Sequence, residues 1–134
     1  MAPQTVADIM TKDVVTVTHN QTVRDALKIL FENNISGAPV VTTDGKAIGI
    51  VSSLDLIVAF GLRQFDIMLR DLTGQLCVKK QIIQLSPDAP IKEALMLIVQ
   101  KRIGRVLVMD ESDNLLGIVS RKDLLKYYAT QLDV

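Results

Sequence analysis

Two short segments of the chain share a pattern of residues that could bind a ligand. Each reads Gly-Ile-Val-Ser-x-x-Asp, once at 49–55 and again at 117–123. We expect a strand to end at the apolar triplet and a helix to begin after the serine, which places the aspartate in the first helical turn. The free N–H groups of a helix N-terminus attract a phosphate. The aspartate could accept hydrogen bonds from two adjacent hydroxyl groups, as an acidic residue does from a ribose in dinucleotide sites.

The same spacing also has a purely structural explanation. Ser-x-x-Asp is close to a capping box, in which the acidic side chain accepts a hydrogen bond from the backbone N–H of the N-cap residue. One copy alone would favour this explanation, because helix caps are common. Two copies at matched positions weaken this explanation, so capping and ligand binding are both open for Ser52, Asp55, Ser120 and Asp123.

The two motifs lie in an internal repeat. When the chain is aligned with itself at an offset of 68 residues, residues 14–57 pair with 82–125 without a gap, and ten of the 44 pairs are identical. A repeat of this kind indicates two copies of one structural unit. We divide the chain into residues 1–70, a first repeat with an N-terminal segment and a long connecting helix, and residues 71–134, a second repeat.

Each repeat predicts the order β-α-β-β-α, so the predicted fold class is α/β (α+β). Short runs rich in Val and Ile predict the first strand, and apolar residues at i, i+3, i+4, i+7 and i+8 predict a helix packed on one face. One sheet face of so small a unit would be bare, so we expect the repeats to pack on each other. The predicted elements are strands over 14–17 and 82–85, helices with the stripes Val23, Ala26, Leu27, Leu30, Phe31 and Ile91, Ala94, Leu95, Ile98, Val99, hairpins over 38–51 and 106–119, and helices from 53 and 121.

The second helix of the first repeat is predicted to be long. Its apolar face continues beyond Gly61 as far as Leu72, and Gly74 marks the connection to the second repeat. Because this helix exceeds the length that the repeat needs, part of the face could be core or could be buried in a two-fold homodimer. The residues open to both interpretations are Leu62, Phe65, Met68 and Leu69.

Composition excludes several classes of function. The net charge is +0 and 49% of the residues are hydrophobic, which argues for a globular core and against disorder or nucleic-acid binding. The N-terminus has no signal-peptide pattern and the longest apolar run is short, so we expect a cytoplasmic protein that does not enter a membrane. His19 and Cys77 are the only residues of their types. They leave no metal cluster, disulfide or nucleophile–base pair, and we therefore expect no catalytic residue and no obligatory cofactor.

The chain resembles a tandem pair of CBS (cystathionine-β-synthase) domains, also called a Bateman module, over about residues 5–130. The resemblance rests on Val-Ala-Asp-Ile-Met-Thr at 6–11, Gly-Ala-Pro-Val at 37–40, and both Gly-Ile-Val-Ser-x-x-Asp turns. It implies that the repeats pack sheet to sheet about a pseudo-two-fold axis and leave two clefts. It also implies that a cleft binds an adenine nucleotide, AMP, ADP or ATP, or a related adenosyl compound.

The resemblance also implies a role for individual residues. In the family, the aspartate of each turn holds the ribose and its serine approaches a phosphate, while the first strand and the Gly-x-Pro segment cover the adenine. The ligand-binding residues implied in this chain are Thr16, Gly37, Ala38, Pro39, Ser52, Asp55, Ile83, Arg105, Ser120, Arg121, Lys122 and Asp123. Arg105 departs from the pattern, because it replaces a small residue of the first repeat with a cation.

We expect the two clefts to be unequal, with tighter binding at Asp123. Arg121 and Lys122 lie at the N-terminus of the same helix, where a ligand phosphate would offset their unfavourable position. The alternative is that both are solvated surface charges.

The leading hypothesis is a stand-alone regulatory module that binds an adenine nucleotide, forms a homodimer and signals occupancy to an effector protein in trans. One alternative is a structural self-association module with no ligand. Another is a small enzyme that acts on a nucleotide. A thermal-shift measurement with nucleotides separates the first two, because a ligand that binds only the folded state raises its stability.

Overall fold

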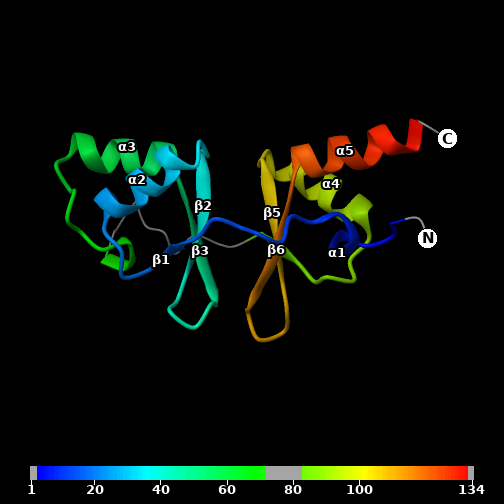
Figure 1. Cartoon of the computed structure of the whole chain (residues 1–134), viewed down its shortest axis with the longest axis horizontal. Coiled ribbons are helices and arrows are strands. Elements are labelled where there is room, and N and C mark those ends of the chain that lie inside the picture. Colours follow the sequence, from blue (N-terminus) through cyan, green and yellow to red (C-terminus); the bar gives the residue numbers. More distant parts are fainter. Residues whose placement is uncertain (1–2, 72–82, 133–134) are drawn as a thin grey trace. The chain divides into compact units, whose positions relative to one another are not determined.

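The computed structural model describes residues 3–71 and 83–132, and the predicted β-α-β-β-α order is confirmed in both repeats (Figure 1). A short helix, α1 (Val6–Ile9), comes first. The first repeat contains β1 (Val17–Thr18), α2 (Val23–Glu32), β2 (Gly37–Val41), β3 (Ala47–Ser52), α3 (Ser53–Gly61) and the 3-10 turn η1 (Leu69–Asp71). The second contains β4 (Gln84–Leu85), α4 (Ile91–Lys101), β5 (Arg105–Met109), β6 (Leu115–Ser120) and α5 (Arg121–Leu132).

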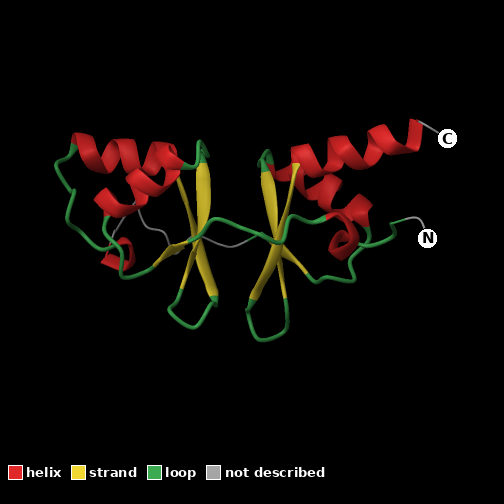
Figure 2. Ribbon diagram, viewed as in Figure 1, coloured by secondary structure: helices red, strands yellow, loops and turns green. Residues whose placement is uncertain are grey.

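Each repeat has its own three-stranded sheet, in the order β1-β2-β3 or β4-β5-β6. The first strand is parallel to the second, and the second and third form an antiparallel hairpin. Figure 2 shows the helices of each repeat on one face of its own sheet. This arrangement follows from the sequence pattern, because a helix with one apolar stripe must bury that stripe against a sheet.

Most positions of the two cores match at the repeat offset. The buried residues of the first core are Val17, Val23, Ala26, Leu30, Ala38, Val40, Val51, Leu56, Ala59 and Leu69. Those of the second core are Val6, Ala89, Ile91, Ala94, Ile98, Val106, Val108, Val119 and Leu124. The last position of each predicted helical stripe is not buried, since Phe31 is 82% exposed and Val99 is 65% exposed. Both helices therefore carry an apolar residue beyond the core of their own repeat.

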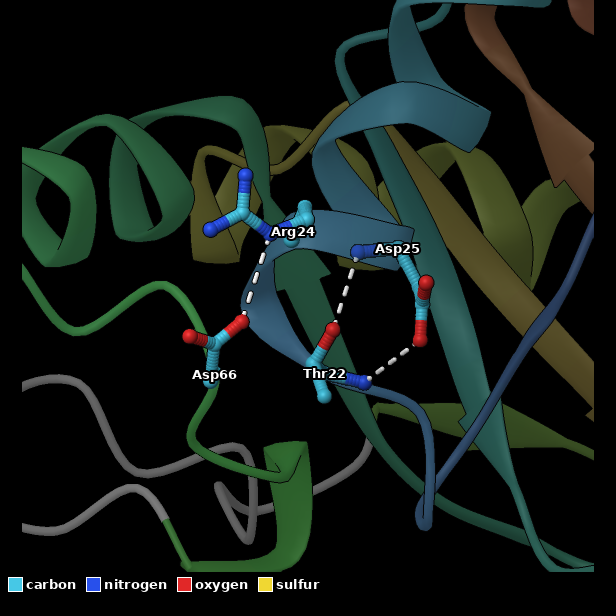
Figure 3. A network of polar contacts seen from close by, with 4 residues as sticks. All are labelled: Thr22, Arg24, Asp25 and Asp66. Atoms are coloured by element: carbon cyan, nitrogen blue, oxygen red, sulfur yellow. Dashed lines mark hydrogen bonds and ion pairs between the residues drawn. The ribbon is translucent and has the colours of Figure 1, made fainter.

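A side-chain cap fixes the start of α2, and an ion pair connects this end to Asp66 of the first repeat (Figure 3). Thr22 is the N-cap: its hydroxyl accepts a hydrogen bond from the N–H of Asp25 at 3.1 Å, and the Asp25 carboxylate accepts one from the N–H of Thr22 at 3.0 Å. The next residue, Arg24, forms an ion pair with Asp66 at 3.3 Å. At its other end α2 stops at Glu32, and Asn34, the residue after the C-cap, has a left-handed φ of 52°, as is common at this position.

The prediction of a long second helix in the first repeat is wrong. The helix α3 ends at Gly61, because Arg63 adopts a left-handed φ of 61° and the N–H of Gln64 bonds back to the carbonyl of Ala59. This closing pattern is a Schellman motif, which turns the chain away from the helix axis.

After this turn the chain runs back along the start of α2. The N–H groups of Val23 and Arg24 donate to the carbonyls of Ile67 and Phe65, at 3.0 and 2.9 Å. Leu69 is fully buried in the core of the first repeat. The apolar residues that suggested a longer helix therefore serve this extended segment and the core. The predicted positions Leu72 and Gly74 lie outside the described residues.

The N-terminal segment belongs to the compact unit of the second repeat. Residues 1–14 group with 83–134, whereas 15–82 form the other unit. The N–H of Val6 donates to the carbonyl of Ala89 at 2.9 Å, and the Val6 side chain is fully buried. This differs from the sequence division, which joined the segment to the first repeat. The physical reason is that Val6 completes the second core, a long-range contact that leaves no periodic signal in the sequence.

Candidate functional site

The first Ser-x-x-Asp turn joins β3 to α3. Ser52 is the N-cap of α3, and its hydroxyl accepts a hydrogen bond from the N–H of Asp55 at 3.1 Å. In return, Asp55 Oδ2 accepts a hydrogen bond from the N–H of Ser52 at 2.9 Å. The Asp55 residue is only 9% exposed. This turn is therefore a complete capping box with a largely buried carboxylate.

The second turn joins β6 to α5 and has the same cap with one addition. Asp123 Oδ2 accepts hydrogen bonds from the N–H of Ser120 at 2.8 Å and from its hydroxyl at 3.0 Å. The other carboxylate oxygen, Oδ1, accepts one from the hydroxyl of Thr11 at 2.8 Å. Asp123 is half-buried. The capping explanation of the motif thus holds in both turns, and Asp123 also has an oxygen that points away from its own cap.

Thr11 reaches Asp123 because the N-terminal segment crosses the end of β6. The N–H of Thr11 donates to the carbonyl of Ile118 at 2.8 Å, and the N–H of Ile118 donates to the carbonyl of Thr11 at 3.0 Å. A Cβ atom on Gly117 would lie only 2.7 Å from the Thr11 carbonyl and from Met10 Sδ. The glycine of the second motif therefore makes room for this crossing, as a glycine in a strand often does for another backbone.

Three positively charged residues belong to the second turn or to the strand beside it. Arg121 and Lys122 are exposed in the first turn of α5. Arg105 pairs with Ser120 in the β5–β6 register, so the two side chains project from the same face of the sheet. Burial lowers the pKa of the Arg105 guanidinium from its ordinary value, and the group remains a cation at neutral pH. The second repeat thus gathers Arg105, Ser120, Arg121, Lys122 and Asp123.

The other predicted ligand residues are divided between the two compact units. Thr16, which precedes β1, and the buried residues 37–39 of β2 belong to the unit of the first repeat. Ile83 belongs to the second, where it packs against the core and its carbonyl accepts a hydrogen bond from Leu107 at 3.2 Å. That residues of the two repeats cooperate around one adenine stays a prediction.

Sequence reasoning missed Thr11 as a site residue. The residue stands in the segment at 6–11 that carried the family resemblance, but the sequence assigned it no contact. Its hydrogen bond to Asp123 joins positions 112 residues apart. No local pattern reports a contact of that sequence separation.

The structure has two cavities of note, and the first is lined in part by Ser53 of the first Ser-x-x-Asp turn. One, of about 300 Å³, is mainly apolar and lies between α2 and α3, with Leu27, Phe31 and Ile57 among its lining residues. The other, of about 340 Å³, lies beside β4 and β5 and is lined in part by Asp88 and Asp110.

Within residues 3–71 and 83–132, no group of three or more His, Cys, Asp or Glu is arranged to hold a metal ion. Every helix in those ranges is too short or too polar to cross a membrane.

The family assignment follows from comparison with known proteins. The model of the CBS domain matches residues 6–61 and again residues 66–130. The chain therefore belongs to the CBS-domain family, with two copies of the domain.

Two curated relatives contain this region as part of a longer protein. The uncharacterized protein MJ1232 of Methanocaldococcus jannaschii is 31% identical over 121 residues, which cover 90% of this chain and 38% of that protein. Homoserine O-acetyltransferase of Methanosalsum zhilinae is 34% identical over 122 residues, which cover 91% of this chain and 23% of the enzyme. The chain thus spans 38% of the length of the first relative and 23% of the length of the second.

Solved structures of CBS-domain proteins have the same fold over nearly the whole chain. The structure of CBSX2 in complex with AMP is 25% identical, with a TM-score of 0.81, and the match covers 98% of this chain and 100% of that one. The CBS domain pair of protein MJ0100, in complex with 5′-methylthioadenosine and S-adenosyl-L-methionine, is 26% identical, with a TM-score of 0.77. That match covers 96% of this chain and 99% of the other.

Proposed function

We propose that the chain is a regulatory module that binds an adenine nucleotide, AMP, ADP or ATP, at its Ser-x-x-Asp turns and signals occupancy to an effector protein. The observation that carries the proposal is the second turn, where a half-buried carboxylate lies in the first turn of α5 with Arg121 and Lys122, and Arg105 lies opposite Ser120. A carboxylate suits the hydroxyls of a ribose, and cations at a helix N-terminus suit phosphates. The adenosine-containing ligands of CBSX2 and MJ0100 support the same class of ligand.

Asp123 is proposed to be the tighter of the two sites. Asp55 is a buried capping residue that has further interactions, whereas Asp123 is half-buried and stands beside Arg121 and Lys122. A ligand hydroxyl reaches a partly exposed carboxylate oxygen without displacing the packing around it. The cations add charge-assisted hydrogen bonds, which are roughly twice as strong as neutral ones.

The module is proposed to bind its ligand without chemical change. The features that support ligand recognition are a carboxylate, helix N–H groups and cations, all of which act by hydrogen bonding and charge. Incubation of the chain with ATP, followed by chromatography of the nucleotides, should therefore yield no product. Formation of ADP, AMP or another product in proportion to the protein would contradict this part of the proposal.

The direct test is calorimetric titration of AMP, ADP, ATP and S-adenosylmethionine into the chain, with GMP as the control ligand. We expect at least one adenosine-containing ligand to bind and to raise the unfolding temperature, because binding to the folded state alone stabilises it. Native mass spectrometry of the purified protein would identify a ligand that remains bound. Absence of binding by all four adenosine compounds at millimolar concentration would overturn the proposal.

Self-association without a ligand is the second candidate function, and one surface favours it. Four apolar side chains of α2, α3 and the C-cap of α3 are more than half exposed: Phe31, Leu54, Ile57 and Leu62. The apolar cavity of about 300 Å³ lies between the same two helices. Exposed apolar patches of this kind commonly mark protein interfaces, and a two-fold contact between like helices is the simplest way to cover one. We propose that a homodimer forms through this surface. A dimer that binds none of the nucleotides would favour a purely structural role.

A further inference from the structure

The hydroxyl of Thr11 contacts the carboxylate that we assign to ribose binding. Thr11 Oγ1 donates a hydrogen bond of 2.8 Å to Asp123 Oδ1, the carboxylate oxygen that α5 does not use for its own cap. Thr11 is exposed and Asp123 is half-buried. Both residues are therefore at least partly open to solvent.

The backbone holds Thr11 in this position independently of its side chain. Two hydrogen bonds between Thr11 and Ile118, of 2.8 and 3.0 Å, attach the segment to β6. The close approach of Met10 and Thr11 to Gly117 adds a steric constraint. Upstream, Val6 is buried in the core of the second repeat. The Thr11 side chain can therefore be changed without removing the contacts that place it.

A count of hydrogen-bond acceptors shows what Asp123 still offers. An ionised carboxylate has about four acceptor positions. Oδ2 already accepts two hydrogen bonds from Ser120, and Oδ1 accepts one from Thr11. One acceptor position thus remains, and it lies on Oδ1. A ribose cis-diol brings two donors, so the carboxylate alone cannot accept both while the cap and the Thr11 bond are intact.

Thr11 supplies the missing acceptor. A threonine hydroxyl that donates its hydrogen still has two lone pairs. Thr11 Oγ1 and Asp123 Oδ1, which we call the oxygen pair, are 2.8 Å apart. This spacing is close to that of the two adjacent oxygens of a cis-diol. Each hydroxyl of the diol can therefore donate to one member of the oxygen pair without breaking any existing hydrogen bond.

We propose that the oxygen pair binds the 2′ and 3′ hydroxyls of the ligand in the second repeat, and that Thr11 thereby selects ribonucleotides over deoxyribonucleotides. This inference rests on the proposed function and deepens it, since it names a residue and a selectivity that the Ser-x-x-Asp motif does not contain. It also gives the N-terminal segment a direct contact with the ligand.

The test compares AMP with 2′-deoxy-AMP and 3′-deoxy-AMP by calorimetry, in the unmodified chain, Thr11→Val and Thr11→Ser. The unmodified chain should bind AMP more tightly than at least one deoxy analogue. Thr11→Val keeps the shape but removes one member of the oxygen pair, so both ribose hydroxyls would have to crowd onto Asp123 Oδ1 or one would stay unpaired. The affinity for AMP should therefore fall by on the order of three- to tenfold, as expected for one hydrogen bond. The analogue that lacks the hydroxyl facing Thr11 should bind Thr11→Val and the unmodified chain equally. Thr11→Ser should keep the preference for AMP.

The outcomes separate this inference from the proposed function. If the unmodified chain binds no adenosine compound, both are overturned. The second outcome is that the unmodified chain binds AMP but Thr11→Val lowers the affinity for AMP and for both analogues by the same factor. Thr11 then has only a structural role, and the inference alone is overturned. Unchanged or tighter AMP binding by Thr11→Val also overturns it, because Thr11 would then be indifferent to the ligand or would compete with it.

Discussion

Arg105 of β5 lies directly opposite Ser120 of β6, whereas the matching pair in the first sheet is Gly37 and Ser52. Residues directly opposite on neighbouring strands project their side chains from the same face. The second repeat therefore places a cation on the same side as the N-cap serine of its Ser-x-x-Asp turn, where the first repeat has no side chain. The two turns are alike in their caps and differ in their charge.

The first prediction concerns this cation. Arg105→Met keeps most of the side-chain volume and removes the charge, so affinity for ATP should fall by roughly tenfold, the effect of losing one charge-assisted hydrogen bond. Affinity for adenosine, which has no phosphate, should change little. Calorimetric titration measures both. Lys126→Met, a change at an exposed residue farther along α5, is the matched control. An equal loss for ATP and adenosine would show that Arg105 acts through the fold and not through a phosphate.

The second prediction concerns the two carboxylates. Asparagine keeps an oxygen that can accept the cap hydrogen bond, so Asp123→Asn should fold normally but lose the charge that strengthens its bonds to the ribose. Affinity for AMP at the tighter site should fall by roughly ten- to a hundredfold. Asp55→Asn should leave that binding event in place. The assignment of the tighter site fails if Asp55→Asn abolishes the tighter event and Asp123→Asn leaves it unchanged.

The third prediction concerns the apolar surface over α2 and α3. Ile57 is 60% exposed beside the cavity. Ile57→Glu would place a charge in the proposed dimer contact, so the protein should be a monomer by light scattering at high micromolar concentration, where the unmodified chain is a dimer. Lys28→Glu, a charge change at an exposed residue of α2, should remain dimeric. A monomeric mass for the unmodified chain at that concentration would refute the dimer.

The fourth prediction concerns the crossing of the N-terminal segment over β6. Gly117→Ala would bring a methyl group within 2.7 Å of the Thr11 carbonyl. The segment must then shift, and the free energy of unfolding should fall by about 1–3 kcal/mol, as for other overpacked sites. Gly61→Ala is the matched control, because a Cβ there meets nothing within 4 Å and alanine favours a helix. Urea unfolding followed by circular dichroism measures both. Equal stability of Gly117→Ala and the unmodified chain would mean that the crossing is loosely held.

Local patterns were sufficient to predict most of the fold. The period-3.6 stripe from Val23 and the matching stripe from Ile91 located α2 and α4, and the serine at the end of each Gly-Ile-Val-Ser segment located the start of α3 and α5. These signals arise from burial of one helix face and from capping, which depend on residues a few positions apart. The same period misled the prediction beyond Gly61, because the backbone of Arg63 ended the helix while apolar residues continued.

Contacts between distant parts of the sequence could not be predicted. The cap geometry of Asp123 was expected from its spacing to Ser120, but its bond to Thr11 depends on where the N-terminal segment docks. The register that sets Arg105 opposite Ser120 likewise depends on the length of the hairpin between them. In both cases the partner is chosen by tertiary structure, and the sequence shows only that a suitable residue exists.

The docking of α1 on the second repeat means that a complete second repeat is not one continuous stretch of the chain. Val6 fills part of its core and Thr11 pairs with Ile118 at its β6 edge, yet both precede the whole first repeat. A fragment that begins at residue 83 would lack these contacts and should fold poorly. Two fragments divided between residues 71 and 83 should instead reassemble when mixed, because the first would carry the missing piece of the second. The compact unit of the second repeat is thus discontinuous in the sequence, and cutting the chain at the midpoint of its repeat does not separate two complete units.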